Sequence, residues 1–326
     1  MGSNDRVEVD LLIIGAGPSG LFGTYYAGFR GMSVAVVDSL PELGGQISAL
    51  YPEKAILDVA GFPEVKGREL VAALVEQAAS ASPTYLLGRT AIALQQDAES
   101  VTVTLDDDTS VVARAVIITA GIGKFTARPL PAGDGWEGRG LVFFVPSFEQ
   151  YAGLDVVIVG GGDSAFDWAH QLTGIAKSIT LVHRRDAFRA HQATVDAVLA
   201  SDVEVITNAQ VTELRGEQHV SEVEITTADG VVTRPAQAVV AALGFVADLS
   251  AMKDWGLEFD KRHIKVGTDM RTNLERVFAA GDINEYPGKV RLIAVGFGEV
   301  ATAVNNAAVV LDPDAHVFPG HSSEGS

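Results

Sequence analysis

The chain contains no cysteine among its 326 residues. This absence excludes disulfide bonds, thiolate nucleophiles, zinc sites with cysteine ligands and iron–sulfur clusters bound through cysteine. A reaction that needs a thiol of the protein itself is therefore excluded, whatever else the sequence encodes.

Positive charge is also scarce. The 24 Lys and Arg residues stand against 42 Asp and Glu residues, which gives a formal net charge of −18 at pH 7. Such acidity favours solubility and argues against nonspecific binding to nucleic acid. An acidic protein partner would need a local basic surface on which to dock.

Long hydrophobic runs are the third absence. We expect no apolar stretch to reach the roughly 18 to 20 residues that span a bilayer, and the polar segment 1–6 does not have the pattern of a secretory signal. The sequence therefore favours a cytoplasmic protein without a membrane partner. Its length is sufficient for two domains.

A glycine-rich G-x-G-x-x-A motif lies in the middle of the chain. The apolar run 156–159 before it predicts a buried parallel strand, and 166–171 after it predicts a helix. In this context the glycines allow a tight turn and a close approach of backbone N–H groups to a pyrophosphate. The motif residues that we expect to bind a dinucleotide are Gly160, Gly162, Asp163 and Ser164.

An earlier copy of the motif follows the predicted strand 10–14. Its residues are Gly15, Gly17, Pro18, Ser19 and Gly20. The next predicted strand, 33–37, ends at Asp38, and the same step along the sequence leads from Gly160 to His183, which Arg184 and Arg185 follow. The two copies thus place opposite charges at the corresponding strand end.

These charges select the nucleotide. A carboxylate accepts hydrogen bonds from ribose hydroxyls and repels a 2′-phosphate, whereas a pair of guanidinium groups binds phosphate oxygens. We therefore expect FAD in the first site and NADPH in the second. Arg189 can assist the pair, His183 either contributes or only packs, and Arg184 and Arg185 are otherwise a solvated surface pair.

The order of motifs predicts an α/β fold with two Rossmann-like dinucleotide-binding domains, the second inserted in the first. We assign 1–120 and 245–326 to the FAD-binding domain and 121–244 to the NADPH-binding domain. The expected helices are 19–30, 67–79, 190–200 and 298–311, and the expected strands include 101–104, 110–112 and 115–120.

Two further regions are expected near ligands. The stretch 43–63 is too long for a simple connector, so we expect it to line a cofactor. Asp282 follows a short apolar strand, where ligands of open α/β sheets bind. Lys289 and Arg291 are either solvated charges or part of a basic docking rim for an acidic carrier.

The motifs together resemble a known family. The strings Gly44-Gly45-Gln46, Leu50 to Lys54, Asp58 to Pro63 and Ala279 to Asp282 accompany the two glycine motifs over nearly the whole chain. This order resembles the low-molecular-weight thioredoxin-reductase branch of the flavin disulfide reductases, and within it the ferredoxin-NADP reductases of the thioredoxin-reductase-like type.

The resemblance implies roles for particular residues. Gly15, Gly17, Gly20 and Asp38 would hold the adenosine and pyrophosphate of FAD. Gly45 would bind the cofactor, Gln46 and Asp58 would lie near the isoalloxazine, Tyr51 would stack on one of its faces, and Asp282 would bind the ribityl chain. His321 would cover the other face from the partner subunit of a homodimer.

The resemblance also implies the activity. Thioredoxin reductases carry a C-x-x-C motif where this chain has Phe143-Phe144-Val145-Pro146, so electrons would leave the flavin directly for ferredoxin or flavodoxin. No general acid or base of the protein and no metal ligand is expected. Two alternatives stay open: a reductase of another acceptor, such as a quinone, oxygen or a separate thiol protein, and an NADPH-binding redox sensor without turnover.

Overall fold

The structure is a computed structural model that describes residues 6–318 and 320. The chain forms two compact units. The first unit holds the described residues up to Ala49, then Lys54–Phe125, and those from Ala247 onward. The second unit holds Leu50–Glu53 and Thr126–Val246. The predicted α/β class, with the second Rossmann-like unit inserted in the first, is confirmed.

The first unit is built on a seven-stranded sheet. Its order is β5 (Thr84–Leu87), β2 (Val34–Asp38), β1 (Arg6–Ile14), β8 (Ser110–Ile118), β7 (Val101–Leu105) and β6 (Ala91–Gln96), with β21 (Val277–Ala279) also paired to β8. The β5-β2-β1-β8 and β8-β21 pairs are parallel, whereas β7 pairs antiparallel with both β6 and β8.

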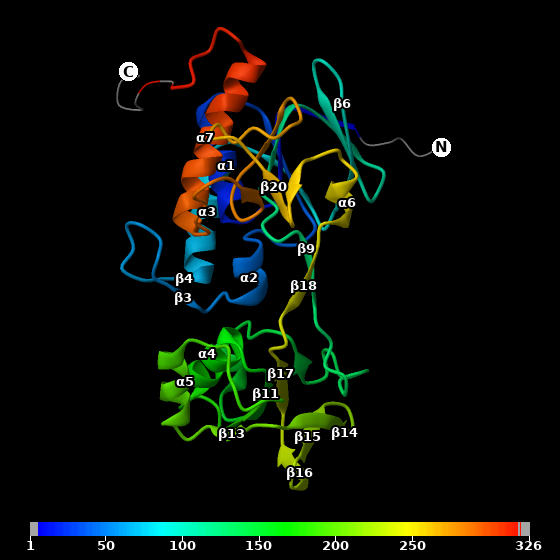
Figure 1. Cartoon of the computed structure of the whole chain (residues 1–326), viewed down its shortest axis with the longest axis vertical. Helices are drawn as coiled ribbons and strands as arrows, with labels where there is room; N and C mark the ends of the chain where they lie inside the picture. The colour runs from blue at the N-terminus through cyan, green and yellow to red at the C-terminus, as the bar shows by residue number, and fades with distance from the viewer. Residues whose placement is uncertain (1–5, 319, 321–326) are drawn as a thin grey trace. The chain divides into compact units, whose positions relative to one another are not determined.

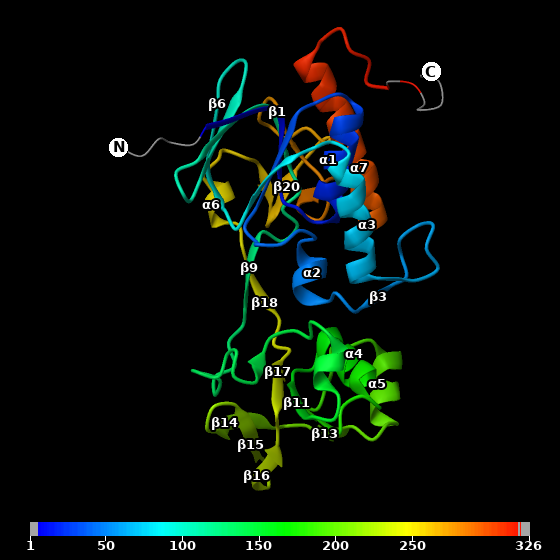
Figure 2. The same ribbon diagram turned by 180° about the vertical axis from the view of Figure 1, so that it is seen from behind.

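Three helices of this unit lie side by side in both views (Figures 1 and 2): α1 (Pro18–Phe29), α3 (Gly67–Ala79) and α7 (Ile293–Leu311). Helices α1 and α7 pack on the sheet face that carries Leu11 and Ile13, and the alternate residues Leu12 and Ile14 contact the core on the opposite face. Strand β1 is therefore apolar on both faces, as a central parallel strand requires.

Helix α7 corrects one expectation. By length and composition, its 19 residues are apolar enough to cross a membrane, so the prediction that no stretch reaches this length was wrong. In the structure, however, Val300, Ala303, Val304 and Ala307 of α7 belong to the core beneath the sheet. The face of α7 that these residues form is thus buried inside the first unit.

Two expectations about strands and helices also change. The predicted separate strands 110–112 and 115–120 are one strand, β8, whose first half pairs with β7 and whose second half pairs with β21. Helix α7 begins at Ile293, earlier than the predicted 298.

The smaller elements are α2 (Gln46–Leu50), β3 (Ala55–Ile56), β4 (Val65–Lys66), β9 (Lys124–Ala127), β18 (Phe245–Asp248), α6 (Ser250–Lys253), β19 (Phe259–Asp260), β20 (His263–Lys265) and β22 (Asn284–Glu285).

The second unit has a five-stranded parallel sheet. Its order is β10 (Leu141–Val142), β17 (Ala238–Ala241), β11 (Asp155–Val159), β12 (Ser178–Val182) and β13 (Glu204–Ile206). The helices are α4 (Asp163–Leu172), α5 (Gln192–Leu199) and the short 3-10 helix η1 (Phe148–Tyr151). An antiparallel sheet follows, of β14 (Gln210–Gly216), β15 (Val220–Thr227) and β16 (Gly230–Pro235).

Strand β11 is covered on both faces. Val156 and Ile158 belong to the core formed with α4 and α5, which lie side by side in Figures 1 and 2. Val157 and Val159 belong to the core formed with the antiparallel sheet. The parallel sheet is thereby fixed between two layers, and its carboxyl edge remains available for a ligand.

A buried ion pair fixes the loop after β21. The side chains of Lys289 and Glu299 are only 1% and 4% exposed. Besides Lys289 Nζ, the Glu299 carboxylate accepts hydrogen bonds from Gly281 N at 2.7 Å, Asn284 Nδ2 at 3.1 Å and Tyr286 Oη at 2.8 Å. Burial, with this bond to Glu299, raises the pKa of Tyr286 to about 12, so its hydroxyl stays a donor at neutral pH.

Replacing Glu299 by Gln should destabilise the first unit. The Glu299→Gln variant leaves the Lys289 ammonium buried without its counter-charge, which typically costs about 3 kcal/mol. Urea unfolding should therefore show a clearly lower midpoint. The control is Glu8→Gln, whose pair with Arg6 is exposed and should contribute little. A Glu299→Gln midpoint equal to that of the control would contradict this account.

Candidate functional site

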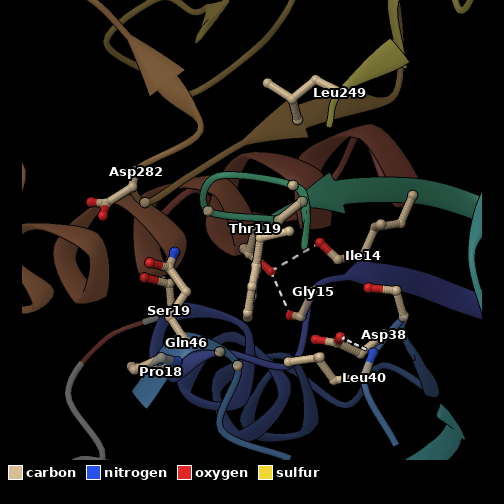
Figure 3. A pocket seen from close by; sticks show the side chains of 18 of the residues that line it. Ile14, Gly15, Pro18, Ser19, Asp38, Leu40, Gln46, Thr119, Leu249 and Asp282 are labelled. Carbon is tan, nitrogen blue, oxygen red and sulfur yellow. Dashed lines mark hydrogen bonds between the residues drawn. The ribbon is translucent and has the colours of Figure 1, made fainter. Parts of the chain in front are cut away.

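The first pocket lies at the carboxyl ends of the parallel strands of the first unit (Figure 3). The turns after β1, β2, β8 and β21 all contribute to it. Among its lining residues are Gly15, Gly17, Pro18, Ser19, Asp38, Gly45, Gln46, Asp58, Thr119, Gly121, Gly281 and Asp282. This is the edge at which open α/β sheets bind their ligands.

The glycines of the first motif have different reasons for being glycine. Gly15 has a φ of +113°, and a Cβ there would lie 2.5 Å from the Thr119 carbonyl oxygen. A Cβ at Gly20 would lie 1.9 Å from the Gly15 carbonyl oxygen. Gly17, by contrast, has nothing within 4 Å of its Cβ position. The fold itself requires glycine at Gly15 and Gly20, whereas Gly17 leaves room for a ligand.

Thr119 is a site residue that we did not predict. Its hydroxyl donates to the Gly15 carbonyl oxygen at 2.7 Å, with the Ile14 carbonyl oxygen at 3.2 Å (Figure 3), and so fixes the glycine turn to the end of β8. The sequence held a signal for it, because Thr119 is the one polar residue of the run 115–120 and lies two positions before Gly121, at the strand end where ligand contacts are expected.

Asp38 lies at the end of β2, as the motif spacing predicts. Its Oδ2 accepts a hydrogen bond from Ala16 N at 2.6 Å, and its Oδ1 accepts one from Leu40 N at 2.8 Å. Burial raises the pKa of Asp38, and the two backbone bonds oppose that rise. A carboxylate has about four acceptor positions, so two remain for ribose hydroxyls.

Asp282 faces the first pocket from the β21 turn (Figure 3). The buried ion pair positions it, because Glu299 accepts the Gly281 N–H and Lys289 Nζ donates to the Gly281 carbonyl oxygen at 3.0 Å. Both readings of Lys289 as a surface charge, solvated or part of a docking rim, were therefore wrong. Arg291 is partly exposed and pairs with Glu285.

Gly45 and Gln46 lie directly beside the motif. A Cβ at Gly45 would lie 2.9 Å from Gly17 Cα, and one at Gly121 would lie 2.9 Å from Gln46 Nε2. The amide of Gln46 thus lies close to the β8 turn, and Gln46 lines the pocket (Figure 3). The close approach of Gly45 and Gln46 to the turns of the pocket supports the expectation that the 43–63 stretch contributes to a cofactor site.

Three residues predicted for the first site remain: Asp58, Tyr51 and His321. Asp58 is exposed and lines the pocket. Tyr51 belongs to the segment Leu50–Glu53, which groups with the second unit, so its stacking role stays a prediction. His321 lies outside the described residues, and its role stays a prediction as well.

The second pocket lies at the carboxyl edge of the parallel sheet in the second unit. The turns after β11, β12 and β17 contribute to it. Its lining includes Arg128, Gly160, Gly161, Gly162, Asp163, Ser164, His183, Arg184, Arg185, Arg189 and Gly244. All the residues predicted for the second site are therefore brought together around one pocket.

The second motif repeats the logic of the first. A Cβ at Gly160 would lie 2.5 Å from the Ala242 carbonyl oxygen, so close packing of the turn on β17 requires glycine. Gly162 again has nothing within 4 Å of its Cβ position. Asp163 begins α4, and its Oδ1 accepts a hydrogen bond from His191 N at 2.8 Å. The carboxylate thereby ties down the segment that follows the arginines.

His183 packs against the turn. A Cβ at Gly161 would lie 2.3 Å from its ring, and the ring centroid lies 5.7 Å from that of Phe188. Burial, together with the charges of the neighbouring arginines, lowers the pKa of His183. A neutral, packed ring fits the reading of His183 as a wall of the pocket, which the sequence left open.

Unpaired arginines surround the second pocket. Arg128, Arg184, Arg185 and Arg189 are exposed, and within the described part of the chain none of their guanidinium groups forms a hydrogen bond or ion pair. The other arginines of the unit are engaged: Arg215 and Arg234 with glutamates, and Arg139 with backbone carbonyls. Within the second unit, the described guanidinium groups without a partner thus lie around one pocket, where they can bind an anion.

Solved structures resemble this chain over nearly its full length. A thioredoxin reductase from T. acidophilum superposes with a TM-score of 0.73 at 26% identity, covering 94% of this chain and 98% of that one. The thioredoxin reductase of Lactococcus lactis in the FR conformation superposes with a TM-score of 0.74 at 22% identity, covering 93% and 99%. The latter likeness concerns the fold alone.

Curated relatives are more similar in sequence. A ferredoxin–NADP reductase from a Nocardioides species is 70% identical, with both chains fully covered. One from Halalkalibacterium halodurans is 47% identical over 96% of this chain and 97% of its own length. The pattern of one protein family matches residues 9–307, which include both glycine motifs and the β21 turn. The chain belongs to the pyridine nucleotide-disulphide oxidoreductase family.

Proposed function

We propose that this protein is an FAD-dependent ferredoxin–NADP⁺ oxidoreductase that moves electrons between NADPH and a ferredoxin or flavodoxin. The observation that carries the proposal is the pair of glycine turns with opposite charge at the next strand end: Asp38 in the first unit, Arg184 and Arg185 in the second. The relatives that bear this name, at up to 70% identity among those compared, support it.

The first pocket fits FAD. The open space at Gly17 admits a pyrophosphate to the start of α1, where backbone N–H groups and the helix dipole favour an anion. Asp38 would accept the adenosine ribose hydroxyls, and Asp282 would bind the ribityl chain. Gln46 and Asp58 would lie along the isoalloxazine.

The second pocket fits NADPH. Gly162 offers the same open space at the start of α4. Arg184 and Arg185, with Arg189 beside them, would bind the 2′-phosphate, and this contact would distinguish NADPH from NADH. His183 would form the wall against which the turn packs.

Bound FAD supplies the chemistry, because it accepts two electrons as a hydride and releases them singly. The protein's residues bind and orient the two nucleotides, and no side chain has to transfer a proton in the hydride step. Since the sequence has no cysteine, the electrons would pass to an external carrier. Tyr51 and His321 would cover the flavin faces, the latter from the partner in a homodimer, and the enzyme would act in the cytoplasm.

The two open glycines give a matched pair of variants. Gly17→Ala should lower the FAD content of the purified protein and weaken FAD binding about 10-fold or more, because the new methyl group occupies the pyrophosphate site. Gly162→Ala should keep its FAD and weaken NADPH binding instead. Flavin absorbance and NADP⁺ titration measure the two effects. Loss of FAD from both variants, or from neither, would contradict the assignment.

The arginine pair should set the nucleotide preference. The Arg184→Ala/Arg185→Ala variant should raise the KM for NADPH roughly 100-fold, since bonds to charged groups contribute about 1.5–3 kcal/mol each. The KM for NADH should hardly change. Arg215→Ala, which removes a positive charge of the same unit away from the pocket, is the control. Equal effects on both nucleotides would show that the 2′-phosphate binds elsewhere.

The carrier is tested with NADPH-driven reduction of cytochrome c. Adding ferredoxin or flavodoxin should accelerate it strongly, while ferricyanide, reduced without a carrier, reports that flavin and NADPH sites are intact. Ferricyanide reduction with no stimulation by any carrier would favour a quinone, oxygen or a thiol protein as acceptor. A single stoichiometric flavin reduction without turnover would favour a redox sensor.

A further inference from the structure

Arg128 lies on the opposite side of the second glycine turn from the other pocket arginines. The sheet order is β17-β11-β12, and the turn follows the central strand β11. Arg184 and Arg185 follow β12. Arg128 N donates to the Gly244 carbonyl oxygen at 2.9 Å, which places it beyond the end of β17. The pocket is therefore bordered by unpaired cations on both sides.

The backbone around Arg128 is held in place. Besides the bond to Gly244, Pro129 restricts the conformation of the residue before it to extended geometries. Leu130, only two positions on, is 5% exposed and belongs to the core of the second unit. The side chain of Arg128 thus extends from a fixed point of the backbone at the rim of the pocket.

The direction of a bound dinucleotide follows from the same sheet. Its pyrophosphate lies at the Gly160–Gly162 turn, and its adenosine ribose lies toward the end of the second strand, here β12. The nicotinamide half therefore extends toward β17. Arg128 is the cation on that side, and within the described residues no carboxylate pairs with it.

We propose that Arg128 binds the phosphate on the nicotinamide side of the NADPH pyrophosphate and thereby positions the nicotinamide half. This inference rests on the proposed function, because it assumes that the second pocket holds NADPH. Under this proposal, the arginines of the pocket have different roles. Arg184 and Arg185 distinguish NADPH from NADH, whereas Arg128 contacts a phosphate that both nucleotides share and does not discriminate between them.

The test compares two ligands that differ in the nicotinamide half. Adenosine 2′,5′-bisphosphate carries the 2′-phosphate and the adenosine-side phosphate but lacks the nicotinamide-side phosphate. Arg128→Ala should weaken NADP⁺ binding to the FAD-loaded protein about 10-fold and leave binding of the bisphosphate within about 2-fold. Arg128→Lys, which keeps the charge, should recover part of the NADP⁺ affinity. The Arg184→Ala/Arg185→Ala variant should lose both ligands.

Several results would overturn the inference. Equal weakening of both ligands by Arg128→Ala would place its contact on the adenosine half or in the fold, and no weakening of either would exclude the contact. A KM for NADPH that rises while that for NADH does not would make Arg128 part of the 2′-phosphate site. If the unaltered protein binds neither ligand, the proposed function fails as well, which separates that failure from a failure of Arg128 alone.

Discussion

The close approach of each glycine turn to a neighbouring strand end is the constraint on which both pockets depend. A Cβ at Gly15 would lie 2.5 Å from the Thr119 carbonyl oxygen, and one at Gly160 would lie 2.5 Å from the Ala242 carbonyl oxygen. Gly20, at the start of α1, must lack a Cβ as well, because that atom would lie 1.9 Å from the Gly15 carbonyl oxygen. Only with helix and sheet this close does the helix N-terminus face the carboxyl edge, where its free N–H groups attract a phosphate. A ligand held at that point would lie beside the side chains at the strand ends.

On this shared framework, the partner of the strand-end group decides what it can bind. Asp38 is held by two backbone N–H groups and not by a cation, so it keeps acceptor positions for hydroxyl groups without attracting a second phosphate. Arg184 and Arg185 have no described carboxylate partner, so their donors remain available for an anion. The corresponding strand ends of the two units thus carry opposite preferences.

What the sequence could predict follows from how local each signal is. The motifs and the charges after them depend on neighbours within one strand-turn-helix unit, and helix 67–79 was predicted with its observed bounds. The early start of α7 was missed because Gly296 weakens helix propensity, yet the structure has this glycine inside α7, with the Ser19 hydroxyl 2.4 Å from its Cβ position. Lys289 was misread because its partner, Glu299, comes from a different element.

Arg128 could not be predicted from the sequence either. It also bears on how an acidic chain could bind an anionic nucleotide. No local motif marks it, since its place in the pocket depends on the pairing of distant segments through Gly244. With a net charge of −18, the long-range field of the chain repels the nucleotide. At physiological ionic strength, however, charges beyond about 8 Å are largely screened. Under the proposed function, the few guanidinium groups at the pocket would then decide binding, and keeping them free of carboxylates would matter more than the overall charge.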